Sequence, residues 1–280
     1  MTSGVLYVVA TPIGNLEDFS PRAVRILQEV ELILAEDTRH SSGLLAHFGI
    51  DTPIMGFHEH NERKFVTRII EKLQAGKTVA LISDAGTPLI NDPGYGLVST
   101  AHTEGINVIP IPGPSAVICA LSASGLPTDR FVYEGFLPGK SAARKKRLVQ
   151  LSKEQRTLVF YEVPHRICDS IMDMMICFGA GREATLAKEL TKRYETIRKD
   201  TLENLLAWLK GEDDRKKGEF VLLVQGSSSR EIDESECIRV LNILLQSLSV
   251  KEAAAIAARI LDESKNRMYQ IALGLTRQEK

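Results

Sequence analysis

Short apolar runs alternate along the first part of the chain with segments whose apolar residues recur at every third or fourth position. The runs predict buried strands at 5–9, 32–35, 53–57, 78–82 and 107–111. The periodic segments predict helices at 20–30, 41–48, 61–75 and 95–103, with another that begins after residue 115. In the first helix, Ser20 suits the N-cap and Pro21 the first turn. This alternation of strand and helix predicts an α/β fold.

The pattern begins again after residues 126–130, which have the composition of a linker. Beyond them we expect helices at 141–151, 167–178 and 202–209, and strands at 157–161, 184–187, 194–199 and 220–224. Residues 226–229, Gly-Ser-Ser-Ser, resemble a flexible linker, and the sequence after them is helical. We therefore predict an α/β domain at 1–128, a second α/β domain at 129–227 and a helical unit at 228–280.

The helical unit carries the pattern of two short helices joined by a tight turn. Ser249 and Glu252 form a capping box that opens an alanine-rich helix to residue 261, and a second helix begins at Lys265. This outline fits a helix-turn-helix unit, in which Lys265, Asn266 and Arg267 would lie where such helices contact nucleic acid. It fits a small helical cap or a dimerisation hairpin equally well, and the pattern does not choose between them.

The overall charge of the chain gives no general attraction to a charged partner. The 280 residues include 35 basic and 36 acidic ones, a net charge of −1, so no overall field draws the chain to nucleic acid or membrane. The first residues lack the layout of a signal peptide and no apolar run reaches the length of a membrane span, so we expect a soluble, cytoplasmic protein. Four scattered cysteines without Cys-x-x-Cys spacing argue against a zinc site, and we expect no metal.

The segment 83–94, Ser-Asp-Ala-Gly-Thr-Pro-Leu-Ile-Asn-Asp-Pro-Gly, is the first candidate for an active site. It places small and turn-forming residues directly after a buried strand. In α/β folds, ligands bind at the carboxyl ends of such strands, where main-chain N–H groups are exposed. A similar strand-turn-helix junction follows at 112–116, Pro-Gly-Pro-Ser-Ala.

Two Gly-Lys pairs, at 76–77 and 139–140, suggest a nucleoside triphosphate site at first sight. Both lack the glycine that a phosphate-binding loop has five positions earlier, where Glu71 and Glu134 stand instead. A dinucleotide site is also disfavoured, because Gly94-Tyr95-Gly96 lacks the third glycine and follows a turn.

Charged residues at one strand end allow two interpretations. Glu36-Asp37-Thr38-Arg39 could orient or deprotonate a hydroxyl group, since paired carboxylates beside an arginine suit acid–base chemistry. Asp37 or Thr38 could equally cap the next helix. Basic residues gather at 144–147 and again among Lys188, Lys192, Arg193, Arg198 and Lys199. Such runs are commonly solvated surface, but they could also supply local phosphate contacts.

In combination, these segments resemble the tetrapyrrole methylase-like family of S-adenosylmethionine-dependent methyltransferases. The resemblance rests on 11–16 (Thr-Pro-Ile-Gly-Asn-Leu), 36–39, 83–94 and 112–116, in that order, and extends through 161–166, 188–192 and 218–221. It covers essentially the whole chain, and the helical end resembles the helix-turn-helix region of family members that act on ribosomal RNA.

The resemblance implies two α/β domains with S-adenosylmethionine in the cleft between them, a homodimer, and a ribose hydroxyl as methyl acceptor. In the family members that this sequence resembles most, the acceptor is the 2′-hydroxyl of a cytidine in the decoding region of 16S rRNA, within the small ribosomal subunit. Methyl transfer of this kind needs no metal. The implied cofactor residues are Asp84, Ala85, Gly86, Thr87, Pro88, Ser115 and Ala116, with Tyr161 and Ala187 matched by position only.

Catalytic and RNA-binding residues are less specific predictions. Asp37 is the candidate proton acceptor or orienting group, and Lys188 a phosphate or hydroxyl contact. Candidate RNA contacts are Arg39, Arg144, Lys145, Lys146, Arg147, Lys265, Asn266 and Arg267. Two other functions stay open: a methylase of the same fold that acts on a tetrapyrrole or other small molecule, and a non-catalytic RNA-binding protein of ribosome assembly.

Overall fold

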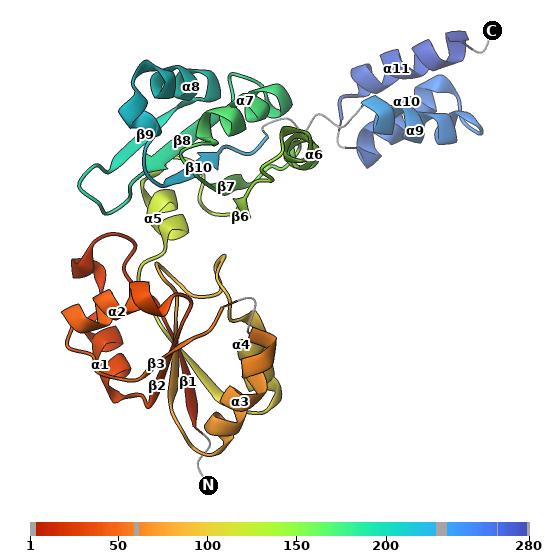
Figure 1. The fold of residues 1–280 in the computed structure, drawn as a ribbon. Coiled ribbons are helices and arrows are strands. Elements are labelled where there is room, and N and C mark those ends of the chain that lie inside the picture. The colour runs from red at the N-terminus through yellow and green to blue at the C-terminus, as the bar shows by residue number, and fades with distance from the viewer. Residues whose placement is uncertain (1–3, 59–61, 228–233, 262, 279–280) are drawn as a thin grey trace. The chain divides into compact units, whose positions relative to one another are not determined.

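A computed structural model describes residues 4–58, 62–227, 234–261 and 263–278 (Figure 1). Contacts between Cα atoms divide the chain into two compact units, Met1–Gly226 and Ser227–Lys280. The predicted linker at 226–229 falls at this division, although Ser228 and Ser229 lie outside the described residues. The boundary predicted at residue 128 stays a prediction, because the larger unit contains both α/β patterns.

The first sheet of the larger unit has five parallel strands in the order β3-β2-β4-β1-β5. The strands are β1 (Val5–Val9), β2 (Leu32–Ala35), β3 (Ile54–Gly56), β4 (Val79–Ile82) and β5 (Asn107–Ile111). Each lies within or close to the range predicted from the apolar runs. Because all five run the same way, the loops that follow them share one edge of the sheet, and the 83–94 loop leaves the central strand.

Helices cover both faces of this sheet (Figure 1). Apolar side chains of α1 (Pro21–Glu29) and α2 (Thr38–His47) pack against Ile33 and Ala80. On the other face, α3 (Glu62–Gln74) and α4 (Tyr95–Thr103) pack against Leu34 and Leu81. Neighbouring strand residues therefore face opposite cores, as expected for strands buried on both sides. As predicted, Ser20 caps α1, accepting a hydrogen bond of 3.1 Å from the Ala23 main-chain N–H.

The second sheet has the order β6-β7-β10-β8-β9 and is mixed. Its strands are β6 (Phe131–Phe136), β7 (Thr157–Glu162), β8 (Glu183–Lys188), β9 (Thr196–Thr201) and β10 (Phe220–Val224). β6 and β7 are parallel, and the other neighbours are antiparallel. The strand β6 was not predicted from the sequence. Its register shifts between Tyr133 and Gly135, and a glycine bulge of this kind interrupts the apolar pattern.

One face of the second sheet packs against α6 (Ser141–Leu151), α7 (Ile167–Phe178) and α8 (Leu202–Gly211). The other face packs against α5 (Ala116–Ala123), where Val117, Ala120 and Leu121 meet Val159 and Val221. The helix that follows the last strand of the first sheet therefore belongs to the core of the second sheet. Two short 3₁₀ helices, η1 (Leu16–Asp18) and η2 (Asp213–Lys216), complete the larger unit.

The smaller unit consists of α9 (Glu234–Leu245), α10 (Val250–Ile260) and α11 (Lys265–Gln278), which share a separate apolar core. The predicted capping box is present: Ser249 Oγ accepts from the Glu252 N–H, and the Glu252 carboxylate accepts from the Ser249 N–H. The helix-turn-helix outline thus corresponds to α10 and α11, with α9 packed against both. Within the described residues, no helix combines the length and apolar character needed to cross a bilayer.

Candidate active site

The 83–94 loop is fixed at its base by the segment that follows β1. Main-chain groups of Thr11 and Gly86 exchange hydrogen bonds of 2.8 and 3.0 Å, an isolated bridge outside the sheet. The buried Thr11 hydroxyl donates to the Ser83 carbonyl at 3.1 Å, and the Ser83 hydroxyl donates to the Gly86 carbonyl at 3.0 Å. The first turn of the loop is therefore rigid.

Several loop residues adopt left-handed main-chain conformations. Leu89 and Asn91 have φ values of 71° and 74°, which are unfavourable for residues other than glycine. Gly86 has a φ of 88°, and a Cβ atom there would lie 3.3 Å from the Ile13 side chain. Strain of this kind persists where surrounding contacts hold it, and it concentrates at ligand sites.

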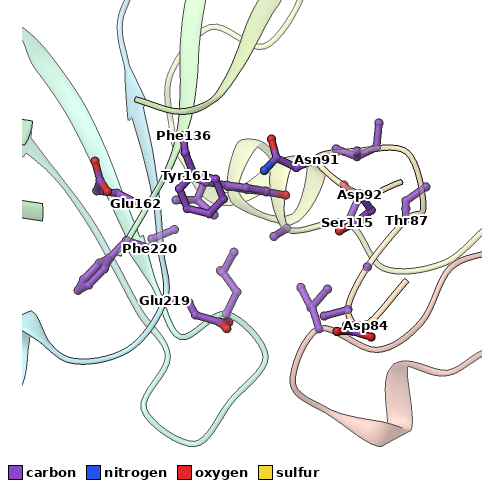
Figure 2. Close-up of a pocket in the computed structure, with 18 of the residues that line it drawn as sticks. Asp84, Thr87, Asn91, Asp92, Ser115, Phe136, Tyr161, Glu162, Glu219 and Phe220 are labelled. Carbon is purple, nitrogen blue, oxygen red and sulfur yellow. The ribbon is translucent and has the colours of Figure 1, made fainter. Parts of the chain in front are cut away.

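A cavity of about 400 Å³ opens above this loop, between the end of the first sheet and strands of the second (Figure 2). Eight of the nine predicted cofactor residues line it: Asp84, Ala85, Gly86, Thr87, Ser115, Ala116, Tyr161 and Ala187. The ninth, Pro88, is buried beside the loop and is not among the lining residues. The four motif segments 11–16, 36–39, 83–94 and 112–116 thus all contribute residues to one cavity.

The 112–116 turn forms a second wall of the cavity. Thr87 Oγ1 donates to the Pro114 carbonyl at 3.0 Å and so joins the two loops. Gly113 is required by close packing, because a Cβ atom there would lie 2.9 Å from the Ala10 Cβ. Ser115 occupies the N-cap position of α5, and its side chain makes no capping hydrogen bond. The N-terminal end of α5 borders the cavity through Ser115 and Ala116, and the dipole of the helix favours a negative or polar ligand group there.

Aromatic rings form the wall contributed by the second sheet (Figure 2). The Tyr161 ring packs edge-to-face against Tyr133 and Phe136, with centroid distances of 5.2 and 5.6 Å. Burial raises the pKa of both tyrosines, so the hydroxyl groups are protonated at neutral pH. These rings offer an apolar surface for a planar group.

Carboxylates concentrate on the opposite wall. Glu36, Asp84 and Asp92 all line the cavity, from the end of β2 and from the 83–94 loop. Burial, together with the negative charges of Glu36 and Asp84, raises the pKa of Asp92 to about 7. A carboxyl group with such a pKa exchanges a proton near neutral pH. From the sequence, Glu36 was expected only as part of a charged cluster, and no role was predicted for Asp92.

Two further acidic residues of the cavity come from the second sheet. Glu162 is 3% exposed and its carboxylate accepts from the Ser170 hydroxyl at 2.5 Å and from Arg166 at 2.9 Å. Glu219 is bound by Lys192 Nζ at 2.8 Å. Both carboxylates are therefore paired with basic side chains, Glu162 with Arg166 and Glu219 with Lys192.

Asp37 takes the helix-capping role that the sequence left open. Its carboxylate accepts from the Arg39 N–H at 2.9 Å and from the Arg39 guanidinium at 2.9 Å. The Arg39 side chain holds the pKa of Asp37 at about 2, so this carboxylate is a weak base. Asp37 is not among the residues that line the cavity. Its main-chain N–H donates to Asp84 Oδ1 at 3.1 Å and so positions a carboxylate that does line it.

Lys188 does not face the cavity either. It is 9% exposed and its Nζ donates to the Asp214 carbonyl at 2.8 Å. On β8 its neighbour Ala187 lines the cavity, and successive strand residues point to opposite faces. This placement does not support a direct contact between Lys188 and the acceptor.

The basic run 144–147 is divided by its helix. Arg144 is 3% exposed and donates to Asp173 at 2.7 Å, so its guanidinium is not available to RNA. Lys145 lies 3.5 Å from the same carboxylate and Arg147 donates to Glu134 at 2.7 Å, although both keep exposed side chains. Lys146 is exposed. The predicted RNA contact at Arg144 is therefore not supported by its position.

The remaining candidate RNA contacts lie at the surface. The Arg39 side chain is 90% exposed while it pairs with Asp37. At the start of α11, Lys265 and Asn266 are exposed, and Arg267 pairs with Glu263 at 2.6 Å.

Across the described part of the chain, no group of three or more His, Cys, Asp or Glu side chains could hold a metal ion.

Comparison with known proteins identifies the family. Residues 5–206 match the family model of tetrapyrrole (corrin/porphyrin) methylases. Residues 231–276 match a second model, described as the RsmI C-terminal HTH domain. The first match includes the whole first sheet and every strand of the second sheet except β10, and the second includes α9, α10 and most of α11.

Curated relatives align over nearly the full length. The ribosomal RNA small subunit methyltransferase I of Pseudomonas aeruginosa is 55% identical over 276 residues, 98% of each chain. The protein of the same name from Escherichia coli O157:H7 is 51% identical over 273 residues, 97% of this chain and 96% of that one.

Solved structures share the fold at lower identity. The methyltransferase CobJ matches with a TM-score of 0.59 and 18% identity over 82% of this chain and 98% of its own. A uroporphyrin-III C-methyltransferase from Thermus thermophilus, complexed with S-adenosyl homocysteine, matches with a TM-score of 0.54 and 20% identity over 79% and 96%. The chain thus belongs to the tetrapyrrole methylases and, within them, to the family of ribosomal RNA small subunit methyltransferases I.

Proposed function

We propose that this protein transfers a methyl group from S-adenosylmethionine to the ribose 2′-hydroxyl of a cytidine in 16S rRNA. The observation that carries the proposal is the cavity at the 83–94 loop, where four motif segments meet around carboxylates and aromatic rings. The names of relatives about half identical to this chain support ribosomal RNA as the substrate. The nucleotide and the 2′-oxygen rest on the resemblance described above.

The cavity suits S-adenosylmethionine in size and in chemistry. A volume of about 400 Å³ is within the usual range for cofactor sites. Tyr161 and Phe136 offer an apolar surface to an adenine ring, and the start of α5 offers N–H groups to a carboxylate. Glu36, Asp84 and Asp92 place negative charge where a sulfonium and an ammonium group require it.

Bound there, the cofactor would supply an electrophilic methyl carbon: the acceptor oxygen bonds to it, and the electron pair of the broken carbon–sulfur bond remains on sulfur. The residues of this chain align the two reactants and accept the hydroxyl proton. Negative charge at Glu36, Asp84 and Asp92 also binds a sulfonium more tightly than the neutral thioether that remains, which favours release of the spent cofactor.

The proton acceptor supported best by position is Asp92, with Asp84 orienting the acceptor. Both carboxyl groups line the cavity, and the pKa of Asp92 of about 7 lets it take up a proton at neutral pH. Asp37 supports this pair through its main-chain bond to Asp84.

RNA contacts in this proposal come from basic and polar side chains at the surface. Lys145, Lys146 and Arg147 on α6 and Lys265 and Asn266 on α11 remain candidates. A homodimer that acts in the cytoplasm on the small ribosomal subunit completes the proposal.

Calorimetry with S-adenosylmethionine and an in vitro methylation assay test the proposal together. We expect one saturable binding site and transfer of the methyl group to small-subunit rRNA. Absence of saturable binding would contradict every enzymatic function. Binding without transfer to RNA, but with transfer to a tetrapyrrole, would favour the small-molecule alternative.

A further inference from the structure

A second cavity, of about 340 Å³, adjoins the candidate cofactor site. Its lining consists of Pro12, Gly14, Leu16, His40, Gly43, Leu44, His47 and Asp84. Among the described residues, Asp84 is the one that lines both cavities, so the two cavities adjoin at this residue. None of the other residues of the second cavity was assigned a role by the sequence.

The segment after β1 separates the two cavities. Ile13 lines the first cavity, whereas its neighbours Pro12 and Gly14 line the second. The main-chain bridge between Thr11 and Gly86 fixes this segment. A molecule in the second cavity would therefore reach the first only near Asp84, and a two-substrate transfer needs such a meeting point.

The helix α2 supplies one flat wall of the second cavity. Its residues His40, Gly43, Leu44 and His47 recur at helical spacing and share one face. A Cβ atom at Gly43 would touch nothing within 4 Å, so this wall is open between two exposed imidazole rings. Imidazoles and apolar side chains beside an open helical backbone suit a planar base, because aromatic groups bind unpaired bases by stacking.

The charge of the second cavity differs from that of the first. Of the described residues that line it, Asp84 is the one carboxylate, beside two histidines, while four further acidic side chains line the first cavity. The first cavity thus attracts a cation. The second cavity suits a neutral base, and it repels the phosphates attached to that base less than the first cavity would.

The loop between β8 and β9 packs against the segment that lines this cavity. Thr191 and the stem of Lys192 lie against Gly14, where a Cβ atom would come within 2.5 Å of Lys192 Cγ. Next in the chain, Arg193 and Tyr194 are exposed, and the guanidinium lies 5.6 Å from the ring centroid. Such a pair suits the backbone and base of a neighbouring nucleotide.

We propose that the second cavity binds the acceptor nucleotide of the RNA, turned out of its strand, with its ribose at Asp84. The inference rests on the proposed function and adds the place of the acceptor to it. Enzymes that modify a nucleotide take it out of the base stack into a pocket, and this cavity has the position and the lining for one.

The test is to fill the cavity from α2 and to measure cofactor and RNA separately. In the full-length protein, Gly43→Leu adds a side chain to the open wall, outside the lining of the first cavity. We expect kcat/KM for small-subunit rRNA to fall by about tenfold or more. Calorimetry should give an unchanged dissociation constant for S-adenosylmethionine. The matched control is Ser42→Leu, on the same helix, exposed and outside both linings. It should methylate like the wild type.

A second variant avoids any added bulk. The double substitution His40→Ala and His47→Ala should raise the KM for RNA by several-fold, on the order of fivefold, while kcat changes little, because it removes binding surface from the acceptor alone. Cofactor binding should again be unchanged.

Failure of the inference differs from failure of the proposed function. If Gly43→Leu and the histidine variant methylate RNA with wild-type kcat and KM, the acceptor lies elsewhere and the inference is wrong. If wild-type protein binds S-adenosylmethionine but methylates a small molecule instead of RNA, the proposed function is wrong and the inference falls with it. Loss of cofactor binding in Gly43→Leu alone would show that the two cavities form one site, which also contradicts the inference.

Discussion

At the scale of single residues, the site depends on which carboxylates face the cavity. Asp37 and Asp84 both follow buried strands, and on the sequence alone Asp37 is the candidate proton acceptor and Asp84 a cofactor residue. In the structure, Asp37 caps α2 and pairs with Arg39, while Asp84 lines both cavities. Asp92 lies only eight residues beyond Asp84, but its altered pKa depends on how the loop turns back, which the residue types do not specify.

The pH dependence of the reaction should report on Asp92. Its carboxylate, the form that accepts a proton, is lost as the pH falls below about 7. At saturating substrates the rate should therefore drop by about tenfold per pH unit below that value and level off above it. Asp92→Asn should abolish this slope and lower the rate by about two to four orders of magnitude.

Methylation rates measured in stopped assays between about pH 5.5 and 9 check the prediction, because this range extends to both sides of a pKa near 7. Calorimetric control of cofactor binding at each pH separates catalysis from affinity. An Asp92→Asn variant with the wild-type pH profile would exclude this carboxyl group as the proton acceptor.

The pair Asp37 and Asp84 offers a matched comparison. Asp84→Asn removes a charge shared by both cavities and should lower kcat by roughly a hundredfold. Asp37→Asn keeps a good N-cap residue and should leave kcat within about twofold of wild type. Single-turnover methylation of rRNA by the two variants shows which of the two carboxylates the reaction needs. The reverse order of effects would restore Asp37 as the catalytic carboxylate.

At the scale of elements, strands and helices with regular apolar patterns were predicted well, and interrupted ones were not. The first-sheet strands lie where the apolar runs predicted them, and the run is clearest for β2 and β4, whose residues are buried on both faces of the sheet. β6 was missed because Gly135 forms a bulge in it. In α6, the spacing of Arg144, Leu148 and Leu151 puts all three on one buried face. That spacing was visible in the sequence and argues against an RNA contact at Arg144.

The buried pair between Arg144 and Asp173 should stabilise the second sheet's helices. Arg144→Ala leaves Asp173 buried without its main partner and should lower the free energy of unfolding by about 3–5 kcal/mol. Lys146→Ala, an exposed change on the same helix, should cost less than about 0.5 kcal/mol. Urea unfolding curves of both variants test this. Equal stability of the two would contradict the structural role of the pair.

The affinity for the cofactor should depend on the main-chain conformation at Gly86. Gly86→Ala forces an alanine into a φ of 88° and against Ile13, at a cost of about 1–3 kcal/mol. We expect the affinity for S-adenosylmethionine to fall by about tenfold, as calorimetry would measure. Gly181→Ala, at an exposed turn with open space around it, serves as the control. Unchanged affinity in Gly86→Ala would mean that the turn does not form the cofactor site.

At the scale of the whole molecule, a nearly neutral chain is proposed to act on a polyanion. The net charge of −1 means that local patches must supply the phosphate contacts. The predicted patches lie on both compact units, on α6 in the larger and at the start of α11 in the smaller. The separate apolar core of α9, α10 and α11 allows the smaller unit to present its residues without support from the larger one.

A salt titration should reveal these contacts. Replacing Lys265 and Asn266 by alanine removes one exposed cation and should weaken rRNA binding uniformly, with the salt slope reduced by about one unit. Cofactor affinity should not change. Filter binding between about 50 and 200 mM salt provides the measurement. An unaltered slope and affinity would favour the alternative in which the helical unit serves as a cap or dimerisation hairpin.

The central claim, methylation of a cytidine ribose in small-subunit rRNA, is tested most directly by mass spectrometry of rRNA from cells with and without this protein. The account predicts that one 2′-O-methylcytidine disappears when the protein is absent. It should return with the wild-type chain but not with Asp84→Asn. An unchanged set of modified nucleosides in the cells that lack the protein would contradict the account.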